Sequence, residues 1–230
     1  MDERLAQRAR TPRYTIAEAG PLVGRPAATV RRWSVGHRRR YNDALKEDAP
    51  LIVLDGDPSE GGMVLSFLNL LELRVLSSYR DEAALQAIRR ALDYAGKQLK
   101  EPRPLISRRF HVHGGELFTK FAETKDGRQL LVNASRHGQT ILQTLIENSR
   151  AVTSDLDYEK ETAYRWWYRS REEPIIVDTR VAAGHPITAE TGVRIDAITS
   201  RSSSGYTPEE IERDTGATTQ EVDSVLRLAA

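Results

Sequence analysis

The stretch YTIAEAGPLVGRPAATVRRWS, residues 14–34, decides how the front of this 230-residue chain folds. Thr15 is a favourable N-cap for a short helix, and a Gly-Pro pair followed by another glycine ends that helix. Pro26 suits the first position of a second helix, which runs to the end of the stretch and places Val30 and Trp33 on one face. Two short helices joined by a glycine-containing turn predict a helix-turn-helix.

The polar residues in and after this stretch predict contacts with nucleic acid. Val30 and Trp33 would hold the second helix against its own core, so the rest of that helix faces outward. Arginine there can contact phosphate or pair with a guanine edge. Three further arginines follow where a winged fold has its wing, beside phosphate or in a narrow minor groove. The candidate DNA-binding residues are Arg25, Thr29, Arg31, Arg32, Arg38, Arg39 and Arg40.

Charge is distributed unevenly along the chain. Residues 1–46 hold eleven Lys or Arg against four Asp or Glu, a net charge of +7, while the whole chain carries only +1. This asymmetry indicates a polyanion partner for the front of the chain alone. The alternative is a basic tail that is disordered and solvated.

Composition excludes several classes of protein. The chain has no cysteine, which removes disulfides, thiol nucleophiles, iron–sulfur clusters and the usual zinc fingers. It holds no run of 18 apolar residues that could span a membrane, and its charged start, Met1–Arg4, does not resemble a signal peptide. We therefore expect a globular protein of the cytoplasm with no membrane partner.

The pattern along the chain predicts a mainly α fold with a minor β part. An N-terminal winged helix-turn-helix would precede central helices with a small hairpin, and then a C-terminal short strand plus helix-turn-helix unit. We expect helices over residues 64–76, 81–95 and 139–147, strands over 51–54 and 175–177, and a hairpin over 110–121. The expected domains are a flexible basic arm over 1–12, the winged helix-turn-helix with its helical and hairpin extension over 13–147, a linker or interface segment over 148–173 and a small helical domain over 174–230.

The end of the chain predicts a second helix-turn-helix by shape. Thr207 and Thr218 each begin a capping box, and Gly216 between them suits a left-handed turn. These two helices carry many carboxylates, which would repel phosphate. We therefore interpret this pair as a protein-contact or dimer module.

Patterns that could carry catalysis are weak. His111 and His113 would share one face of a strand, and with Glu116 and His137 they could hold zinc. Isolated surface histidines beside arginines are far commoner, so we predict no metal, no cofactor and no catalytic residue. The polar, aromatic stretch that contains Trp166-Trp167 either packs between two domains or anchors a partner.

These motifs together resemble the long VapB-type antitoxins of bacterial toxin–antitoxin operons, over nearly the whole chain. Residues 14–33 are similar to that family's MerR-like winged helix-turn-helix, and Pro174–Ala230 to its small antitoxin-associated domain of unknown function. The other segments that carry the resemblance are Ser66–Arg74, Ile88–Leu92, Pro104–Phe110, Arg165–Trp167 and the Gly184, Pro186, Ile187 and Thr191 positions of the last domain. Four positions depart from the family pattern. Arg25 stands where a capping Ser or Asp is frequent, and Asn69 where the family has Asp. Glu190 stands where the family usually has Gly, and Gly192 where it often has Arg.

The resemblance implies a PIN-type, magnesium-dependent ribonuclease toxin as partner and repression of the shared operon. We therefore expect a non-catalytic antitoxin that binds operator DNA, as a homodimer because one short recognition helix carries little sequence information. A basic, aromatic segment would suit an acidic nuclease site, and the candidate toxin-binding residues are Arg165, Trp166, Trp167, Arg169 and Arg171. The alternatives are a stand-alone MerR-like transcriptional regulator without a toxin, or a metal-dependent enzyme built on the histidines.

Overall fold

The computed structural model describes residues 3–41, 44–59, 62–79, 103–106, 153–160 and 162–229, with helical positions at 89, 93 and 97. Its contacts divide the chain into two compact units. We call Arg10–Ser154 the front unit, and Met1–Ala9 together with Asp155–Ala230 the back unit. Among the described residues, no helix has both the length and the apolar character that crossing a membrane requires.

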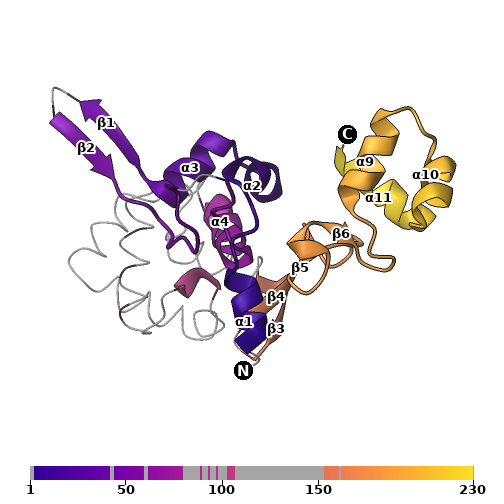
Figure 1. Cartoon of the computed structure of the whole chain (residues 1–230), viewed down its shortest axis with the longest axis horizontal. Coiled ribbons are helices and arrows are strands. Elements are labelled where there is room, and N and C mark those ends of the chain that lie inside the picture. Colours follow the sequence, from indigo (N-terminus) through magenta and orange to yellow (C-terminus); the bar gives the residue numbers. More distant parts are fainter. Residues whose placement is uncertain are drawn as a thin grey trace, which may run out of the picture. The chain divides into compact units, whose positions relative to one another are not determined.

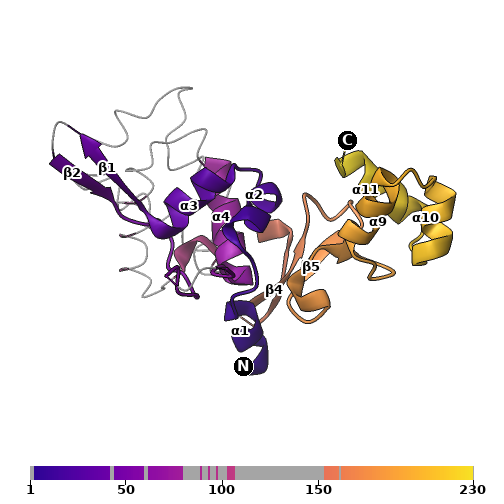
Figure 2. The same ribbon diagram turned by 45° about the horizontal axis from the view of Figure 1, so that its top comes forward.

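The front unit begins with the expected helix-turn-helix, and the expected wing follows it. β1 pairs with β2 as an antiparallel hairpin, which extends away from the α2–α3 pair in Figures 1 and 2. The winged helix-turn-helix and the mainly α character are therefore confirmed. The elements of this unit are α2 (Ile16–Val23), α3 (Ala27–Val35), β1 (His37–Tyr41), β2 (Ala44–Asp48), α4 (Phe67–Tyr79) and the 3-10 helix η1 (Pro104–Ile106).

Local chemistry explains the tight turn between α2 and α3. Thr15 caps α2 as predicted: its hydroxyl accepts the Glu18 N–H at 3.1 Å, and its own N–H donates to the Glu18 carboxylate at 2.8 Å. Gly24 ends α2 at a φ of 69°, which glycine adopts without strain. A Cβ at Gly20 would lie 2.9 Å from the carbonyl oxygen of Arg25, so only glycine lets the two helices approach this closely.

Helix α4 forms the centre of the front unit's core and packs against α2. It begins three residues later than the 64–76 pattern predicts, because Leu65 pairs with Tyr14 in an isolated bridge. Ser66 then caps the helix, since its hydroxyl accepts the Asn69 N–H at 3.1 Å. The fully buried side chains of α4 include Phe67, Leu70, Leu71, Leu73 and Val75.

The strand predicted over residues 51–54 is wrong, because this segment forms bends. The Leu51 N–H donates to the Trp33 carbonyl at 2.7 Å, and the Val53 carbonyl accepts the Asn69 side-chain amide at 2.7 Å. These backbone groups therefore form hydrogen bonds with the end of α3 and with the Asn69 side chain, whereas in a strand they would pair with a neighbouring strand.

The expected flexible arm over residues 1–12 is helical for most of its length. α1 spans Glu3–Arg10. Leu5 and Ala9, four residues apart and so on one helix face, are only 5% and 0% exposed. The basic charge of this segment favours a solvated tail, whereas this short apolar stripe is the signal that favours a packed helix.

The back unit contains a four-stranded antiparallel sheet in the order β3-β4-β5-β6 and a group of three helices. Both figures show the helices gathered at one end of the sheet. Two of the strands lie inside the segment expected as a linker over 148–173. The elements are β3 (Leu156–Glu159), β4 (Thr162–Trp167), β5 (Ile175–Asp178), the 3-10 helix η2 (Ala182–Gly184), β6 (Ile187–Thr188), α9 (Ile195–Ser203), α10 (Pro208–Thr215) and α11 (Thr219–Ala229).

The three C-terminal helices share one core with β5. Ile175, Ile198, Ile211 and Val222 are each 0% exposed and belong to the same cluster. Both predicted capping boxes form, at the starts of α10 and α11. Gly216 turns the chain between them at a φ of 74°, as expected. The second helix-turn-helix shape is therefore confirmed.

Several predicted elements fall outside the described residues. These are the hairpin over 110–121, the helix over 139–147 and, apart from positions 89 and 93, the helix over 81–95. The four zinc candidates, His111, His113, Glu116 and His137, also lie outside them. Within the described part of the chain, no group of three or more His, Cys, Asp or Glu residues could hold a metal ion.

Candidate nucleic-acid interface

Helix α3 has one buried face and one exposed face. Val30, Trp33 and Ser34 are 0%, 1% and 1% exposed, as the hydrophobic pattern predicts for the first two. At about 100° per residue, the opposite side of the helix presents Arg31 and Arg32 to solvent. The helix is therefore fixed from behind, while its basic side chains remain accessible.

The predicted contact residues of α3 differ in how far they reach the surface. Arg31 and Arg32 are exposed, and Thr29 is half-buried at the edge of their face. Neither arginine pairs with a carboxylate among the residues that the structure describes. Both guanidinium groups therefore retain donors for phosphate or a base edge.

Arg25 takes a different position from the one predicted. It is half-buried, its Nε donates to the Ser77 hydroxyl at 2.9 Å and its Nη2 donates to the Ser77 carbonyl at 2.6 Å. A guanidinium group stabilises the carbonyl end of a helix, here the last turn of α4. Arg25 therefore ties the start of α3 to the core, and its contact with DNA stays a prediction.

The wing carries the remaining predicted contacts. The β1–β2 register places Arg38 opposite Glu47, Arg39 opposite Lys46 and Arg40 opposite Leu45. This confirms that the three arginines lie in the wing, as the sequence predicts. Their side chains lie outside the described residues, so their contact with DNA stays a prediction.

A buried arginine supports the interface from within the front unit. Arg103 pairs with Glu72 at 2.6 Å and with Asp55 at 2.7 Å, and all three side chains are largely buried. Ser66 donates its hydroxyl to Asp55, and Asn69 donates its side-chain amide to Glu72 at 3.2 Å. This network joins the 51–56 loop, the first turns of α4 and the residue that precedes η1, so it fixes the scaffold against which α2 packs.

The network explains the polar positions of the 66–74 motif. Ser66, Asn69 and Glu72 recur every three residues among the apolar residues of 64–73, which is the signal that could have revealed the network. Asn69 replaces the usual Asp and can donate to Glu72, which an ionised Asp cannot do. Burial raises the pKa of Glu72 to about 7, although the charge of Arg103 opposes this rise. Sequence reasoning overlooked Arg103.

A second candidate surface lies on β4 of the back unit. The register aligns Asp157, Arg165 and Asp178 across three strands. Arg165 donates to Asp178 at 2.8 Å, and the Trp167 indole N–H donates to Asp157 at 3.1 Å. The basic and aromatic side chains predicted here therefore rest on two acidic side chains from neighbouring strands.

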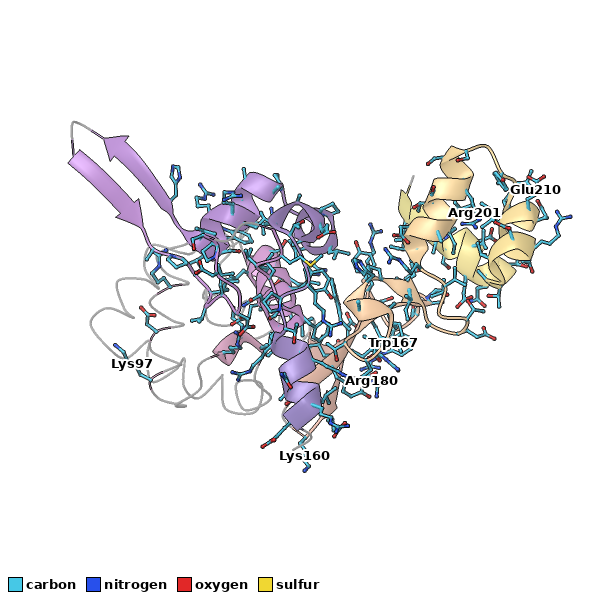
Figure 3. The ribbon with its side chains drawn as sticks, viewed as in Figure 1. Lys97, Lys160, Trp167, Arg180, Arg201 and Glu210 are labelled. Carbon is cyan, nitrogen blue, oxygen red and sulfur yellow. The ribbon has the colours of Figure 1, made fainter. Side chains whose placement is uncertain are left out.

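Arginine and aromatic side chains stack on this surface. Arg165 lies 5.9 Å from the ring centroids of both Tyr164 and Trp167. Arg180 lies 4.1 Å from the Tyr164 ring, and Arg171 lies 5.7 Å from the Trp167 ring. We call these five residues the arginine–aromatic cluster; Figure 3 labels Trp167 and Arg180.

Two of the predicted toxin contacts lie elsewhere. Trp166 is 1% exposed and its ring meets that of Tyr168 edge-on at 5.2 Å, so it belongs to the core and cannot reach a partner. Arg169 is exposed in the turn after β4, at a φ of 70°. The paired tryptophans therefore have two different positions, since one packs internally and the other reaches the surface.

Glu221 organises the C-terminal helices. It is 1% exposed, and its carboxylate accepts the N–H groups of Glu190 and Thr191 at 2.9 and 3.1 Å. It also accepts the Thr191 hydroxyl at 2.6 Å and the Thr218 N–H at 3.1 Å. Glu190 contributes only its backbone here, which explains why this departure from the family pattern is tolerated.

Comparisons with known proteins agree with these observations. The domain family described as "Putative DNA-binding HTH domain" matches residues 12–92. A Mycobacterium tuberculosis protein named "Putative antitoxin VapB45" is 27% identical over 239 residues, which cover 100% of this chain and 98% of that protein. The X-ray crystal structure of Rv2018 from Mycobacterium tuberculosis superposes with a TM-score of 0.72 at 24% identity, covering 94% of this chain and 98% of the other.

The likeness to the crystal structure shows a shared fold. The domain match and the full-length relative confirm the resemblance that the motifs indicate, to a long VapB-type antitoxin with an N-terminal helix-turn-helix. The DNA-binding domain match covers α2, α3, the wing and α4, which are the elements that form the candidate interface.

Proposed function

We propose that this protein is a non-enzymatic antitoxin that binds operator DNA through α3 and the wing. It represses its own operon and neutralises a PIN-type ribonuclease toxin by direct binding. One observation carries the DNA-binding part: Val30 and Trp33 are buried while Arg31 and Arg32 on the other side of the same helix are exposed. A helix that is fixed by its core and basic outside suits the major groove.

The test uses full-length protein and a labelled duplex from the region upstream of its own gene. The variant R31A/R32A removes two exposed arginines from α3, and R213A/R227A removes two from α10 and α11 as the matched control. We expect the α3 variant to bind at least tenfold more weakly. Its slope of log affinity against log salt should be shallower by about 1 for each phosphate that the variant no longer neutralises. Equal binding by both variants would contradict the proposal.

The toxin contact is assigned to the arginine–aromatic cluster and the neighbouring Arg169. The three arginines of the cluster and Arg169 together outnumber the two aspartates beneath them, Asp157 and Asp178. The side chains of Arg171 and Arg180 are 47% and 38% exposed. Magnesium-dependent nucleases hold their ion with carboxylates, so a net basic surface complements such a site.

Co-purification tests this second contact. The full-length protein is co-expressed with the product of the adjacent gene, and R169E/R171E is compared with a charge-matched control, R213E/R227E. We expect the cluster variant alone to lose the nuclease while it retains DNA binding. If the unmodified protein binds DNA but captures no nuclease, the stand-alone MerR-like regulator is the better function.

The proposal also includes a homodimer in the cytoplasm, where operator DNA is found. A single α3 can contact only a few base pairs, so a pair of half-sites is needed for a specific operator. Light scattering of the purified protein, alone and with DNA, measures this directly. A protein–DNA complex with one chain per duplex would contradict the dimer.

A further inference from the structure

The buried network around Arg103 contains more acidic than basic groups. The side chains of Arg103, Asp55 and Glu72 are only 7%, 13% and 4% exposed. With both carboxyl groups ionised, the network would hold two negative charges and one positive charge, so one negative charge would be buried without compensation. An uncompensated buried charge is costly, and a carboxyl group avoids this cost by binding a proton.

The described residues supply no second cation for this network. Arg74 is the other charged residue of α4, and it lies two positions after Glu72, so it points about 200° away around the helix. Helix α2, which also packs against α4, has Glu18 as its charged side chain, and this side chain is exposed. Within the described part of the chain, the charges that act on Glu72 are therefore those of Arg103 and Asp55.

Of the two carboxyl groups, that of Glu72 is the one suited to hold a proton. Asp55 uses both oxygens as acceptors, since Oδ1 accepts Arg103 at 2.7 Å and Oδ2 accepts the Ser66 hydroxyl. The hydrogen bonds described for Glu72, from Arg103 at 2.6 Å and Asn69 at 3.2 Å, both end on Oε2. The other oxygen of the more deeply buried carboxyl group is thus left for a proton.

The network is connected to the end of α3 through the 51–56 loop. Arg103 and Asn69 both donate to the Val53 carbonyl, at 3.3 and 2.7 Å. In the same loop, the Leu51 N–H donates to the Trp33 carbonyl near the end of α3 at 2.7 Å. The Val53 side chain is 65% exposed, so the loop lies at the surface, where a small movement would admit water. A surplus of charge in the network is relieved by such a movement, which would weaken the support of α3.

We infer that the Glu72–Arg103–Asp55 network is a pH-sensitive switch, which holds one proton while the 51–56 loop is closed on α4 and loses it as the loop opens. Rising pH then loosens the support of α3 from behind. The effect on DNA rests on the proposed function, because it requires α3 to be the DNA-binding helix. The proton and the loop movement can be measured without DNA.

The direction of the pH effect follows from the burial of Glu72. Burial raises the pKa of this carboxyl group to about 7, whereas a glutamate in an unfolded chain has a pKa of about 4.3. The folded state therefore binds the proton more tightly, so this stabilisation is complete below about pH 4.3 and is lost as pH rises through about 7. Between these values, the ratio of folded to unfolded front unit should fall by about tenfold for each pH unit.

The first experiment measures the proton directly in the full-length protein. Glutamate is isotope-labelled at its side-chain carboxyl carbon, and the nuclear magnetic resonance signal that is missing from E72Q identifies Glu72. We expect this signal to titrate with a midpoint near pH 7. D55N removes the second negative charge and should lower the midpoint. D57N, the same substitution at an exposed position of the neighbouring chain, should leave it unchanged.

The second experiment measures loop opening and DNA binding at about pH 6 and about pH 8. Hydrogen exchange of the Leu51 amide, corrected for its intrinsic pH dependence, should speed up about tenfold more in wild type than in E72Q. Affinity for the upstream duplex should fall about three- to tenfold more in wild type than in E72Q. His37 in the wing can also gain charge at low pH, but both proteins retain it, so their comparison isolates Glu72.

Three results would decide against parts of this account. A titration midpoint of Glu72 near pH 4.5 would overturn the inference. A midpoint near pH 7 together with the same pH dependence of Leu51 exchange in wild type and E72Q would overturn it as well, because the proton would then not control the loop. If the protein binds no duplex at either pH, the proposed DNA binding fails, while the titration and the exchange still decide whether the switch exists.

Discussion

The α2–α3 pair and the α10–α11 pair have the same local design in two parts of one chain. Thr15 and Thr207 each open the first helix with a capping box, and Gly24 and Gly216 each end it at a positive φ. In both pairs the second helix is held by a buried apolar stripe. Backbone chemistry alone therefore does not distinguish the two pairs.

The two pairs differ in the charge on their outer surface. Arg31 and Arg32 are exposed on α3, whereas on α10 and α11 four exposed carboxylates outnumber two exposed arginines. These residues are Glu209, Glu210, Asp214 and Asp223 against Arg213 and Arg227. Carboxylates repel a phosphate backbone, while guanidinium groups attract it. Turn and cap residues therefore fix the shape of such a helix pair, and the charge of its exposed face decides which partner that shape can bind.

Reversing the charge of α3 should produce the largest effect. We expect R31E/R32E to weaken binding to the upstream duplex by at least about a hundredfold, because each change removes an attraction and adds a repulsion. The companion variant, Q220R/D223R on α11, should gain only about a few-fold in salt-sensitive, non-specific binding. Fluorescence anisotropy titrations at two salt concentrations measure the affinities of both variants. Sequence-specific binding by the α11 variant would contradict the assignment of DNA binding to α3 alone.

Removing the charge of Glu221 should have the next largest effect, on the back unit. E221Q can no longer accept four hydrogen bonds, so we expect it to destabilise the α9–α11 group by about 3 kcal/mol. Hydrogen exchange of the α11 amides measures this. E212Q, a change of the same type at a half-buried position, serves as the control, and an equal cost at both positions would contradict the role of Glu221.

The effect of E221Q should depend on pH. Burial acts to raise the pKa of Glu221, but hydrogen bonds from Thr191, Thr218 and Glu190 hold it below its usual value. The ionised group therefore stabilises the fold fully above the unfolded pKa of about 4.3, and this contribution is lost as pH falls through the folded pKa. We expect the difference between wild type and E221Q to be constant near neutral pH and to shrink below about pH 4.

Replacing Arg25 should have a moderate effect that separates positioning from contact. R25A removes the link to Ser77, so we expect a loss of about 1–3 kcal/mol in the stability of the front unit. If Arg25 acts only by positioning α3, DNA binding of the folded protein should weaken with no change in the slope of affinity against salt. A slope lowered by about 1, as expected for R31A, would establish Arg25 as a DNA contact.

The smallest effect should come from the caps, where the two pairs are alike. We expect T15A and T207A each to cost about 1 kcal/mol, because each removes one hydroxyl acceptor from a helix N-terminus. Thr15→Ser and Thr207→Ser should restore most of this loss. Thermal unfolding of the four variants measures it, and a cost at one position only would show that the two pairs are not equivalent in design.

Local signals were sufficient to predict both helix pairs. Thr15, Pro26, Thr207 and Gly216 act through bonds within a few residues, so their patterns can be recognised in the sequence. The buried stripe of Val30 and Trp33 was predicted for the same reason. The triple arginine at 38–40 lies shortly after the second helix, where a winged fold has its wing.

Other features depend on contacts between distant residues, which spacing does not reveal. Arg25 meets Ser77 and Arg103 meets Asp55, and neither pair has a pattern that links its members. Trp166 and Trp167 are adjacent, yet the alternation of a strand buries one and leaves the other on the surface. The sequence showed that the pair was unusual, but only the sheet decides which ring a partner can reach.

The assignment of α1 to the back unit has a consequence for how the protein is made. A ribosome releases residues 10–154 before residues 155–230, so the front unit can complete its own contacts while α1 still lacks the strands and helices of its unit. During synthesis α1 therefore emerges first but can complete its contacts only after residues 155–230 have been made. A nascent chain would form the candidate DNA interface of α3 and the wing before the surface assigned to the toxin. A tag placed before α1 would affect the folding of the back unit, most of which is encoded at the other end of the gene.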